Sequence, residues 1–402
     1  MIPPLRLFVV AGEPSGDIMA AALVEALREL APAGIELSGV GGERLEARGL
    51  RSLFPMEELA VMGLAEVLPR LPSLRRRLTA TVEAVRRWKP DIVLTVDSPG
   101  FNLRLLGRLR GLPLRRVHYV APQAWAWRPG RAAALAGLVD RLLVVLPFEP
   151  AFFARYGVEA RFVGHPAIER VRSDGDHRGF VARHGLGDAG PVLLLLPGSR
   201  RQELARHLPV LGQATAELRR RFPRLRTVLP TLAHLLPAIE AEVGDWPLRP
   251  VVVTGEAERM AAFAAGDLAL TASGTATLEL ALAGVPMIVA HRLHPLSALV
   301  ARRLIRVPYV SLANLVLGRQ VVPELLQSEC RAEVLVPQAD RLLRDGDAVA
   351  AQRAALAEIR ACLTVGSEAP SRCAARAVLE AAAPPDQPRS ASGTKARFGS
   401  PV

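Results

Sequence analysis

Short apolar runs alternate with helix-like segments along most of this 402-residue chain, and this alternation constrains the fold most. The runs are rich in Val, Ile and Leu, and most of them lie next to Gly or Pro. Such runs are typical of strands in a parallel sheet that is covered by helices on both faces. They lie at residues 5–11, 35–40, 92–96, 117–120, 142–146, 192–196, 251–253, 268–270 and 287–289.

A turn-rich, charged stretch at residues 173–179 divides these runs into two series. A single hydrophobic core seldom grows beyond roughly 250–300 residues, so we expect two domains. We predict an α/β protein with two Rossmann-like, doubly wound domains at residues 1–170 and 185–330. Helices over residues 331–382 complete the predicted fold, and the Pro/Ser/Gly-rich residues 383–402 are predicted to be a disordered tail.

The charge balance indicates an anionic partner. Lys and Arg number 51 against 39 Asp and Glu, a formal net charge of +12. Lys89 and Lys395 are the only lysines, and this arginine preference reads as a coding bias. Nucleic-acid binders usually place aromatic stacking platforms among their basic residues, but aromatic residues make up only 4% of this chain. We therefore expect a phosphate-bearing ligand or an anionic membrane surface, and no nucleic acid.

Three features favour the cytoplasm. No apolar run reaches the roughly 18–20 residues that span a bilayer. The three cysteines form no even-numbered disulfide framework. The first residues also lack the charged-then-apolar layout of a signal peptide.

Ligands of open parallel sheets bind on the loops that follow the carboxyl ends of strands. In the first half, residues 11–17 hold two glycines and Ser15, which is placed to cap a helix near an anion or a sugar oxygen. Asp97 follows a buried run, where it serves either as a general base or as a helix cap. Trp125 and Trp127 stand two residues apart, so both rings do not share one helix face, and they suit a wall for a sugar or acyl group.

The second half holds two loops suited to a nucleoside diphosphate. In residues 196–203, Gly198 allows close backbone approach, Ser199 is placed to cap a helix, and Arg200 offers a charged fork for a pyrophosphate. Spacing does not choose between Arg200 and Arg201. Residues 271–279 hold three hydroxyl side chains and a glycine, with Glu279 placed to bind a ribose diol. The dinucleotide fingerprint is absent and no metal-ligand spacing occurs, so we expect neither cofactor nor metal.

Residues 54–78 are strongly apolar, contain Pro69 and Pro72, and end in three arginines. An apolar surface with a basic rim suits an interfacial element near anionic lipid or a groove for acyl chains. An ordinary core helix with a solvated arginine end accounts for the same composition equally well.

Taken together, the motifs resemble the bacterial lipid-A-disaccharide synthase family. The shared stretches run in the family's order over roughly residues 5–330. They are residues 10–17 (VAGEPSGD), 39–42 (GVGG), 61–63 (VMG), 96–102 (VDSPGFN), 123–128 (QAWAWR), 146–149 (LPFE), 163–166 (VGHP), 196–200 (LPGSR), 272–275 (ASGT) and 309–315 (YVSLANL). The resemblance implies a GT-B fold with a cleft between an acceptor domain and a UDP-sugar domain.

The resemblance also implies the reaction. An inverting transferase would join UDP-2,3-diacylglucosamine to 2,3-diacylglucosamine 1-phosphate, giving the β-1,6-linked disaccharide 1-phosphate and UDP in lipid A biosynthesis. A UDP-sugar epimerase or a GT-B transferase for a soluble sugar is the alternative. The family further implies peripheral attachment to the inner membrane and a homodimer with exchanged C-terminal segments.

Roles for individual residues follow from the resemblance. Asp97 is the expected base, with Glu13 as its competitor or orienting partner, and Gly100 stands where some relatives have a second carboxylate. The expected donor residues are Ser199, Arg200, Glu203, Ser273, Gly274, Thr275, Glu279 and Asn314. The expected acceptor and acyl-binding residues are Ser15, Met62, Asn102, Trp125 and Trp127.

Overall fold

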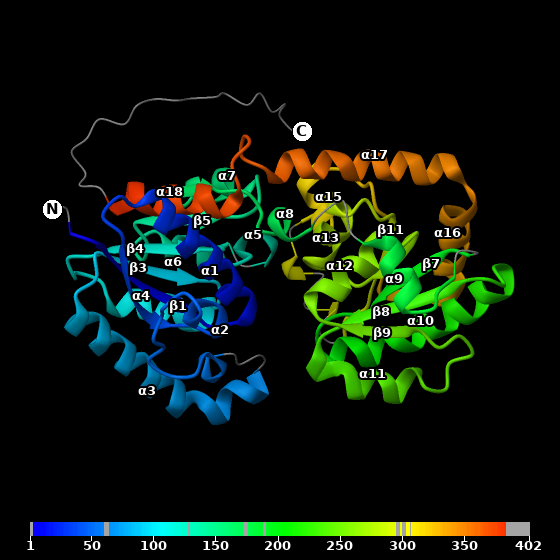
Figure 1. The fold of residues 1–402 in the computed structure, drawn as a ribbon, viewed down its shortest axis with the longest axis horizontal. Coiled ribbons are helices and arrows are strands. Elements are labelled where there is room, and N and C mark those ends of the chain that lie inside the picture. The colour runs from blue at the N-terminus through cyan, green and yellow to red at the C-terminus, as the bar shows by residue number, and fades with distance from the viewer. Residues whose placement is uncertain are drawn as a thin grey trace.

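Two six-stranded parallel sheets, one in each half of the chain, form the centres of two lobes (Figure 1). The computed structural model describes residues 3–59, 64–127, 129–171, 176–187, 190–294, 298–299, 303–305 and 307–382. The first sheet contains β1 (Leu5–Ala11), β2 (Ile35–Val40), β3 (Ile92–Val96), β4 (Arg115–Tyr119), β5 (Arg141–Val144) and β6 (Ala160–Phe162). The second contains β7 (Val192–Leu196), β8 (Arg226–Thr231), β9 (Val251–Thr254), β10 (Leu268–Thr271), β11 (Met287–His291) and β12 (Glu324–Leu326). The predicted fold class is confirmed.

The order of the strands identifies one position in each sheet at which the direction of strand addition reverses. The first sheet runs β2-β1-β3-β4-β5-β6, and the second runs β12-β11-β10-β7-β8-β9. After β1 and after β7 the chain first builds outward on one side and later returns to the other side. In doubly wound sheets, the loops at such a position diverge and leave room for a ligand at the carboxyl edge, so the β1/β3 and β7/β10 positions are where a ligand is expected.

Three strands were not predicted from the sequence. β6 and β12 have only three residues each, which is too short for a clear apolar run. β8 (RTVLPT) contains Arg, Thr and Pro and few apolar residues. Each lies toward the outside of its sheet, where fewer apolar side chains are needed.

Helices cover both sheets. Those of the first half are α1 (Pro14–Leu30), α2 (Glu43–Glu46), α3 (Leu64–Trp88), α4 (Pro99–Arg108), α5 (Ala124–Trp127), α6 (Gly130–Leu135), α7 (Glu149–Ala154) and α8 (Ala167–Arg170). Those of the second half are α9 (His177–Arg183), α10 (Arg201–Arg221), α11 (Leu236–Val243), α12 (Glu256–Ala265), α13 (Ala276–Leu282), α15 (Leu312–Leu317), α16 (Ala332–Arg344), α17 (Gly346–Leu363) and α18 (Pro370–Ala382). No helix in the described residues is long and apolar enough to cross a membrane.

The helix α3 continues through Pro69 and Pro72. Near its middle, Arg77 forms an ion pair with Glu58 at 2.6 Å and stacks over the Phe54 ring. The side chains of residues 64–68, and all of residues 60–63 with Met62, lie outside the described residues. The choice between an interfacial and a core role for this segment therefore stays a prediction.

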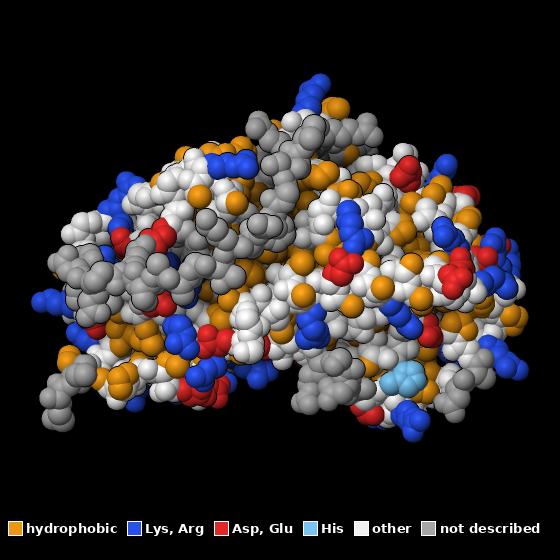
Figure 2. All heavy atoms as spheres, turned by 90° about the horizontal axis from the view of Figure 1, so that it is seen from above, with side chains coloured by type: hydrophobic (Ala, Val, Ile, Leu, Met, Phe, Trp, Pro, Cys, Tyr) orange, Lys and Arg blue, Asp and Glu red, His pale blue; other side chains and the backbone are white. Residues whose placement is uncertain are grey.

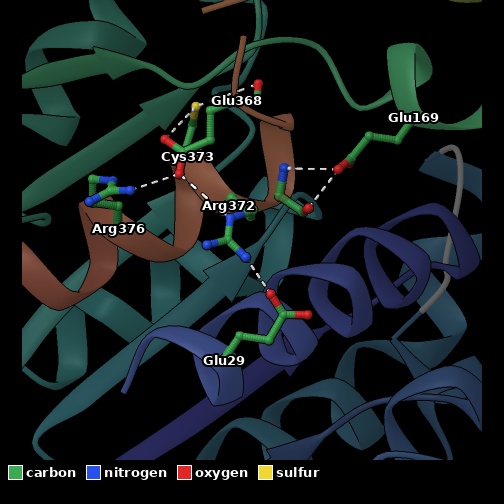
Figure 3. A network of polar contacts seen from close by, with 7 residues as sticks. Glu29, Glu169, Glu368, Arg372, Cys373 and Arg376 are labelled. Carbon is green, nitrogen blue, oxygen red and sulfur yellow. Dashed lines mark hydrogen bonds and ion pairs between the residues drawn. The ribbon is translucent and has the colours of Figure 1, made fainter. Parts of the chain in front are cut away.

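The C-terminal helices divide between the lobes. α16 and α17 pack on the second lobe, whereas α18 crosses back and lies against α1, β4 and β5 (Figure 1). Figure 3 shows how α18 is attached: Arg372 pairs with Glu29 of α1, and the Ser371 hydroxyl donates to Glu169 of α8 at 2.6 Å. The chain thus crosses between the lobes twice, once before β7 and once before α18.

Asp17, at the end of the glycine-containing stretch 11–17, has a structural role that needs no ligand. It is 3% exposed, and its carboxylate accepts the backbone N–H groups of Gly42 at 2.8 Å, Arg44 at 2.9 Å and Leu45 at 3.3 Å. These are orphan donors at the start of α2, which the buried carboxylate satisfies from the neighbouring helix. Asp17 therefore holds the β2–α2 turn against α1.

Replacing this carboxylate should destabilise the first lobe. We expect Asp17→Ala to lower the free energy of unfolding by about 3 kcal/mol, because one buried and two partly buried N–H donors lose their acceptor. The matched control is Ser15→Ala, which removes an exposed hydroxyl from the same turn of α1 and should change stability by less than about 0.5 kcal/mol. Urea denaturation measures both variants, and equal stability of the two would contradict this role.

Candidate active site

Two carboxylates meet at the β1/β3 position of the first sheet. Glu13 follows β1 and Asp97 follows β3, and the hydroxyl of Ser98 donates to Glu13 Oε1 at 3.2 Å. Burial raises the pKa of Asp97 most and the negative charge of Glu13 adds to this effect, and together they raise it to about 6. A carboxylate with such a pKa is a base that is ionised at neutral pH and still has appreciable proton affinity.

The backbone at Asp97 is held in an uncommon conformation. Asp97 has φ 48° and Ser98 has φ 42°, both in the left-handed region that residues other than glycine rarely adopt. The fully buried Asn102 supports this turn, since its Nδ2 donates to the Asp97 carbonyl at 2.8 Å and to the Val96 carbonyl at 3.1 Å. A Cβ on Gly12 would lie 2.7 Å from the Ser98 hydroxyl, so a glycine is required there. Asn102 thus shapes the turn that presents Asp97.

The predicted helix caps are wrong. α1 begins at Pro14 with Glu13 at its N-cap, so Ser15 lies inside the helix. α10 begins at Arg201 with Arg200 at the N-cap, which leaves Ser199 outside. Asp97 caps no helix either, because Ser98 occupies the N-cap of α4 and no side chain accepts a capping hydrogen bond there. The carboxylate of Asp97 is therefore not occupied by a capping role.

Trp125 lies in the core rather than on an open wall. Its ring is 9% exposed, contacts Phe148 edge-on at 5.0 Å between centroids, and donates from Nε1 to Glu149 Oε1 at 3.0 Å. The other oxygen of Glu149 accepts the N–H groups of Val145 and Leu146. Burial raises the pKa of Glu149 to about 7. The side chain of Trp127 lies outside the described residues.

The two predicted phosphate loops adjoin at the β7/β10 position. The Ala272 amide donates to the Leu196 carbonyl at 2.8 Å, which places residues 197–200 beside residues 272–275. Gly198 and Gly274 have φ values of 122° and 118°, which favour glycine. Ser273, Gly274 and Thr275 immediately precede α13, with Thr275 as its N-cap.

The side chain of Glu203, in the first turn of α10, contacts the loop that follows β7. Its carboxylate accepts the Ser199 amide at 2.8 Å and pairs with Arg200 at 3.3 Å. The two groups predicted to hold a pyrophosphate therefore already face an anionic side chain. Arg200 remains 61% exposed, so an incoming anion has access to its guanidinium despite the pairing with Glu203.

Glu279 does not present a free carboxylate. It is 4% exposed and pairs with Arg170 of α8 at 3.1 Å and with Arg259 of α12 at 3.2 Å. Arg170 belongs to the segment that leaves the first sheet, so this ion pair joins the two lobes at the carboxyl edge of the second sheet. Its partners lie 109 and 20 residues away in sequence, and no sequence signal identifies them.

The amide of Asn314 is fully used inside the second lobe. Its Nδ2 donates to the Val322 carbonyl and to Glu324, and its Oδ1 accepts the N–H groups of Val321 and Val322. An amide side chain has two donors and two acceptor positions, and all four are occupied. Asn314 therefore holds the turn before β12 and has no free group for a ligand.

Sequence reasoning missed His207. This residue is 2% exposed on α10 and contacts both the Pro197 carbonyl and the Arg292 amide. Its ring lies 5.3 Å from that of His291, whose Nδ1 is buried without a hydrogen-bond partner in the described structure. Burial lowers the pKa of His291 to about 4, so both rings are neutral at physiological pH or close to it. A lone histidine inside a helix gives no motif, which is why the sequence did not reveal it.

Two solved structures that share the two-lobe fold are named as UDP-N-acetylglucosamine 2-epimerases. A putative UDP-N-acetylglucosamine 2-epimerase from Listeria monocytogenes superposes with a TM-score of 0.64 at 17% identity, covering 94% of this chain and 95% of that one. The UDP-GlcNAc 2-epimerase from Neisseria meningitidis, solved bound to UDP-GlcNAc, has a TM-score of 0.62 at 10% identity and covers 94% and 99%. At these identities the likeness establishes the fold alone.

Sequence relatives establish the family. The family model described as Lipid-A-disaccharide synthetase matches residues 7–378. A Lipid-A-disaccharide synthase from Rhodospirillum centenum is 47% identical over 378 residues, covering 94% of each chain. One from Granulibacter bethesdensis is 49% identical over 330 residues, covering 82% of this chain and 84% of the relative. The chain therefore belongs to the lipid-A-disaccharide synthase family.

Proposed function

We propose that this chain transfers the diacylglucosamine unit of UDP-2,3-diacylglucosamine to the 6-hydroxyl of 2,3-diacylglucosamine 1-phosphate. The products are the β-1,6-linked disaccharide 1-phosphate and UDP. One observation supports the proposal within this family. A buried carboxylate, the candidate base, lies at the carboxyl edge of the first sheet, and a glycine loop that carries an arginine lies at the carboxyl edge of the second sheet. Purified chain incubated with both substrates should form the disaccharide and release UDP, as followed by thin-layer chromatography. Absence of any disaccharide would refute the proposal.

The proposed mechanism uses one proton transfer and one displacement. Asp97 takes the proton of the acceptor 6-hydroxyl as its oxygen attacks the anomeric carbon of the donor. The bond from that carbon to the β-phosphate oxygen breaks, and the electron pair leaves with UDP. Arg200 and the amides of the 197–200 and 272–275 loops stabilise the charge that develops on the pyrophosphate. Attack opposite the leaving group inverts the anomeric configuration.

Glu203 sets a condition for donor binding. Because its carboxylate accepts from Ser199 and Arg200, a pyrophosphate must displace it or share these donors. A carboxylate and a phosphate repel each other, so we infer that Glu203 turns away when UDP binds. Ser199 and Arg200 then bind the phosphate oxygens.

The positions of the exposed apolar side chains support the part of the proposal that concerns lipid. Among the described residues, the exposed large hydrophobic side chains belong to segments that come after strands in the chain. The Leu53 N–H donates to the carbonyl of Gly39 near the end of β2, Leu232 follows β8, and the remaining three come after β11 in the chain. These three are Leu299, Leu304 and Ile305, with exposed fractions of 55%, 40% and 40%. We propose that these side chains form an apolar edge that faces acyl chains and the membrane.

The surface charge supports no nucleic-acid role. Figure 2 shows basic and acidic side chains intermixed on the face seen from above. Many arginines are paired, for example Arg116 with Asp140 at 3.0 Å and Arg48 with Glu25 at 2.7 Å. The net charge therefore forms no single basic field on that face.

Attachment to the inner membrane from the cytoplasm and a homodimer remain part of this proposal.

The role of Asp97 gives a first test. Asp97→Asn should lower kcat by about 10²–10⁴-fold, because the acceptor hydroxyl loses its base. UDP affinity should stay within about twofold, since the nucleotide lies on the other lobe. In the unaltered protein, kcat/KM should fall as the pH drops below about 6, where Asp97 becomes protonated. Turnover of Asp97→Asn at the original rate would reject this base.

Glu13 provides a second, independent test. Its charge raises the pKa of Asp97, so Glu13→Gln should move the acidic limb of the pH–rate profile to lower pH. The variant should retain at least about a tenth of the original kcat at pH 8. If Glu13→Gln instead abolishes turnover while Asp97→Asn does not, Glu13 is the base.

The apolar edge gives a third test. The double variant Leu299→Ser and Leu304→Ser should bind phosphatidylglycerol vesicles at least about a hundredfold more weakly, because burying each leucine contributes about 1.5–3 kcal/mol. Ala354→Ser with Ala357→Ser, on an exposed face of α17, is the matched control and should bind like the original protein. Vesicle flotation measures both. Unchanged flotation of the leucine variant would remove this edge from the membrane contact.

A further inference from the structure

His207 connects two segments of the donor lobe that come from different strands. It lies on α10, while its Nδ1 is 2.7 Å from the carbonyl oxygen of Pro197, in the loop after β7. Its Nε2 is 3.0 Å from the backbone nitrogen of Arg292, just after β11. In the sheet, β7 and β11 flank β10, whose own loop carries Ser273. One imidazole therefore touches the segments on both sides of the second phosphate loop.

The two contacts determine the state of the ring. A carbonyl oxygen only accepts a hydrogen bond, so Nδ1 must carry the hydrogen. The Arg292 N–H only donates, so Nε2 must hold a lone pair. Both bonds exist together only in the neutral imidazole with the hydrogen on Nδ1. Burial lowers the pKa of His207 and so favours this neutral state, against the opposing influence of Glu203.

The contact with Pro197 aims the next peptide group. The Pro197 carbonyl and the Gly198 N–H belong to one planar trans peptide, in which the two groups point in opposite directions. Because the carbonyl points into the buried ring of His207, the Gly198 N–H points away from it. Gly198 has φ 122° and no side chain to restrain its conformation. The imidazole thus supplies an orientation that the glycine itself does not enforce.

We propose that His207 is a positioning residue of the donor site, which holds the loop at residues 197–200 in the orientation that receives the pyrophosphate. It does so by binding this loop to the segment after β11. The inference rests on the proposed function, since that function places UDP on this loop. His207 is 2% exposed and need not touch the substrate.

The competing explanation is simple packing, because the His207 ring also lies against His291. Two substitutions separate the explanations. His207→Phe keeps an aromatic ring but forms neither hydrogen bond. His207→Asn loses the ring but places an amide N–H near the position of Nδ1, where it donates to the Pro197 carbonyl.

The experiment measures UDP binding by calorimetry on the full chain. We expect His207→Phe to bind UDP about tenfold more weakly, because the loop loses two hydrogen bonds that orient it. His207→Asn should bind within about threefold of the original protein. Amide hydrogen exchange, measured without UDP, should be faster in His207→Phe for the peptide that includes Ser199 and for that which includes Arg292.

The matched control is His118→Phe. His118 is also fully buried, and its Nδ1 lies 2.8 Å from the Thr95 hydroxyl, but it belongs to the first sheet. This variant should lose stability and keep its UDP affinity. UDP binding of His207→Phe equal to that of the original protein would refute the positioning role, as would His207→Asn binding no better than His207→Phe.

Arg200→Ala separates this failure from that of the proposed function. If the original protein binds UDP and Arg200→Ala weakens binding, the proposed donor site is supported. The His207 variants then test only the positioning role. If the original protein does not bind UDP, both the donor site and the inference fall. Unchanged hydrogen exchange in His207→Phe would count against the inference independently of UDP.

Discussion

A parallel sheet exposes its functional loops along one edge only, and the rest of this structure depends on where two such edges lie. All twelve strands are parallel to their neighbours, so the loops that follow them emerge on the carboxyl side of each sheet. Arg170, which leaves the first sheet through α8, pairs with Glu279 at the carboxyl edge of the second. The segment that follows the last strand of the first sheet therefore contacts the carboxyl edge of the second sheet.

The candidate base depends on local strain that other residues offset. A left-handed conformation costs a non-glycine residue about 1–2 kcal/mol, and Asp97 and Ser98 adopt it in succession. Asn102 offsets this cost with two buried hydrogen bonds, and Gly12 leaves room for the Ser98 hydroxyl. The geometry that brings Asp97 close to Glu13 also raises its pKa, so a single turn determines both the position and the proton affinity of the base.

The sequence predicted the position of candidate loops well where a residue type has only one physical role. Glycines and hydroxyls after Leu196 and Thr271 indicated the two loops of the second lobe, because strand ends with small residues admit a ligand's phosphate. It was less informative where several uses compete. Ser15 and Ser199 read as caps, yet the helices begin elsewhere, since a helix end is fixed by backbone geometry that neighbouring residues share. Trp125 was predicted to line a binding wall, but its indole N–H donates to the buried carboxylate of Glu149, 24 residues away.

Contacts between distant segments could not be predicted at all. The pairing of Glu279 with Arg170 and the bridging by His207 require the fold before any partner can be assigned. The same holds for the two crossings between lobes. The His165 amide donates to the Leu363 carbonyl at 2.9 Å, and Arg360 reaches the Val171 carbonyl, so the outgoing and returning chains are bonded to each other. A change in the angle between the lobes must therefore bend both crossings together, close to the ion pair that joins Glu279 to Arg170.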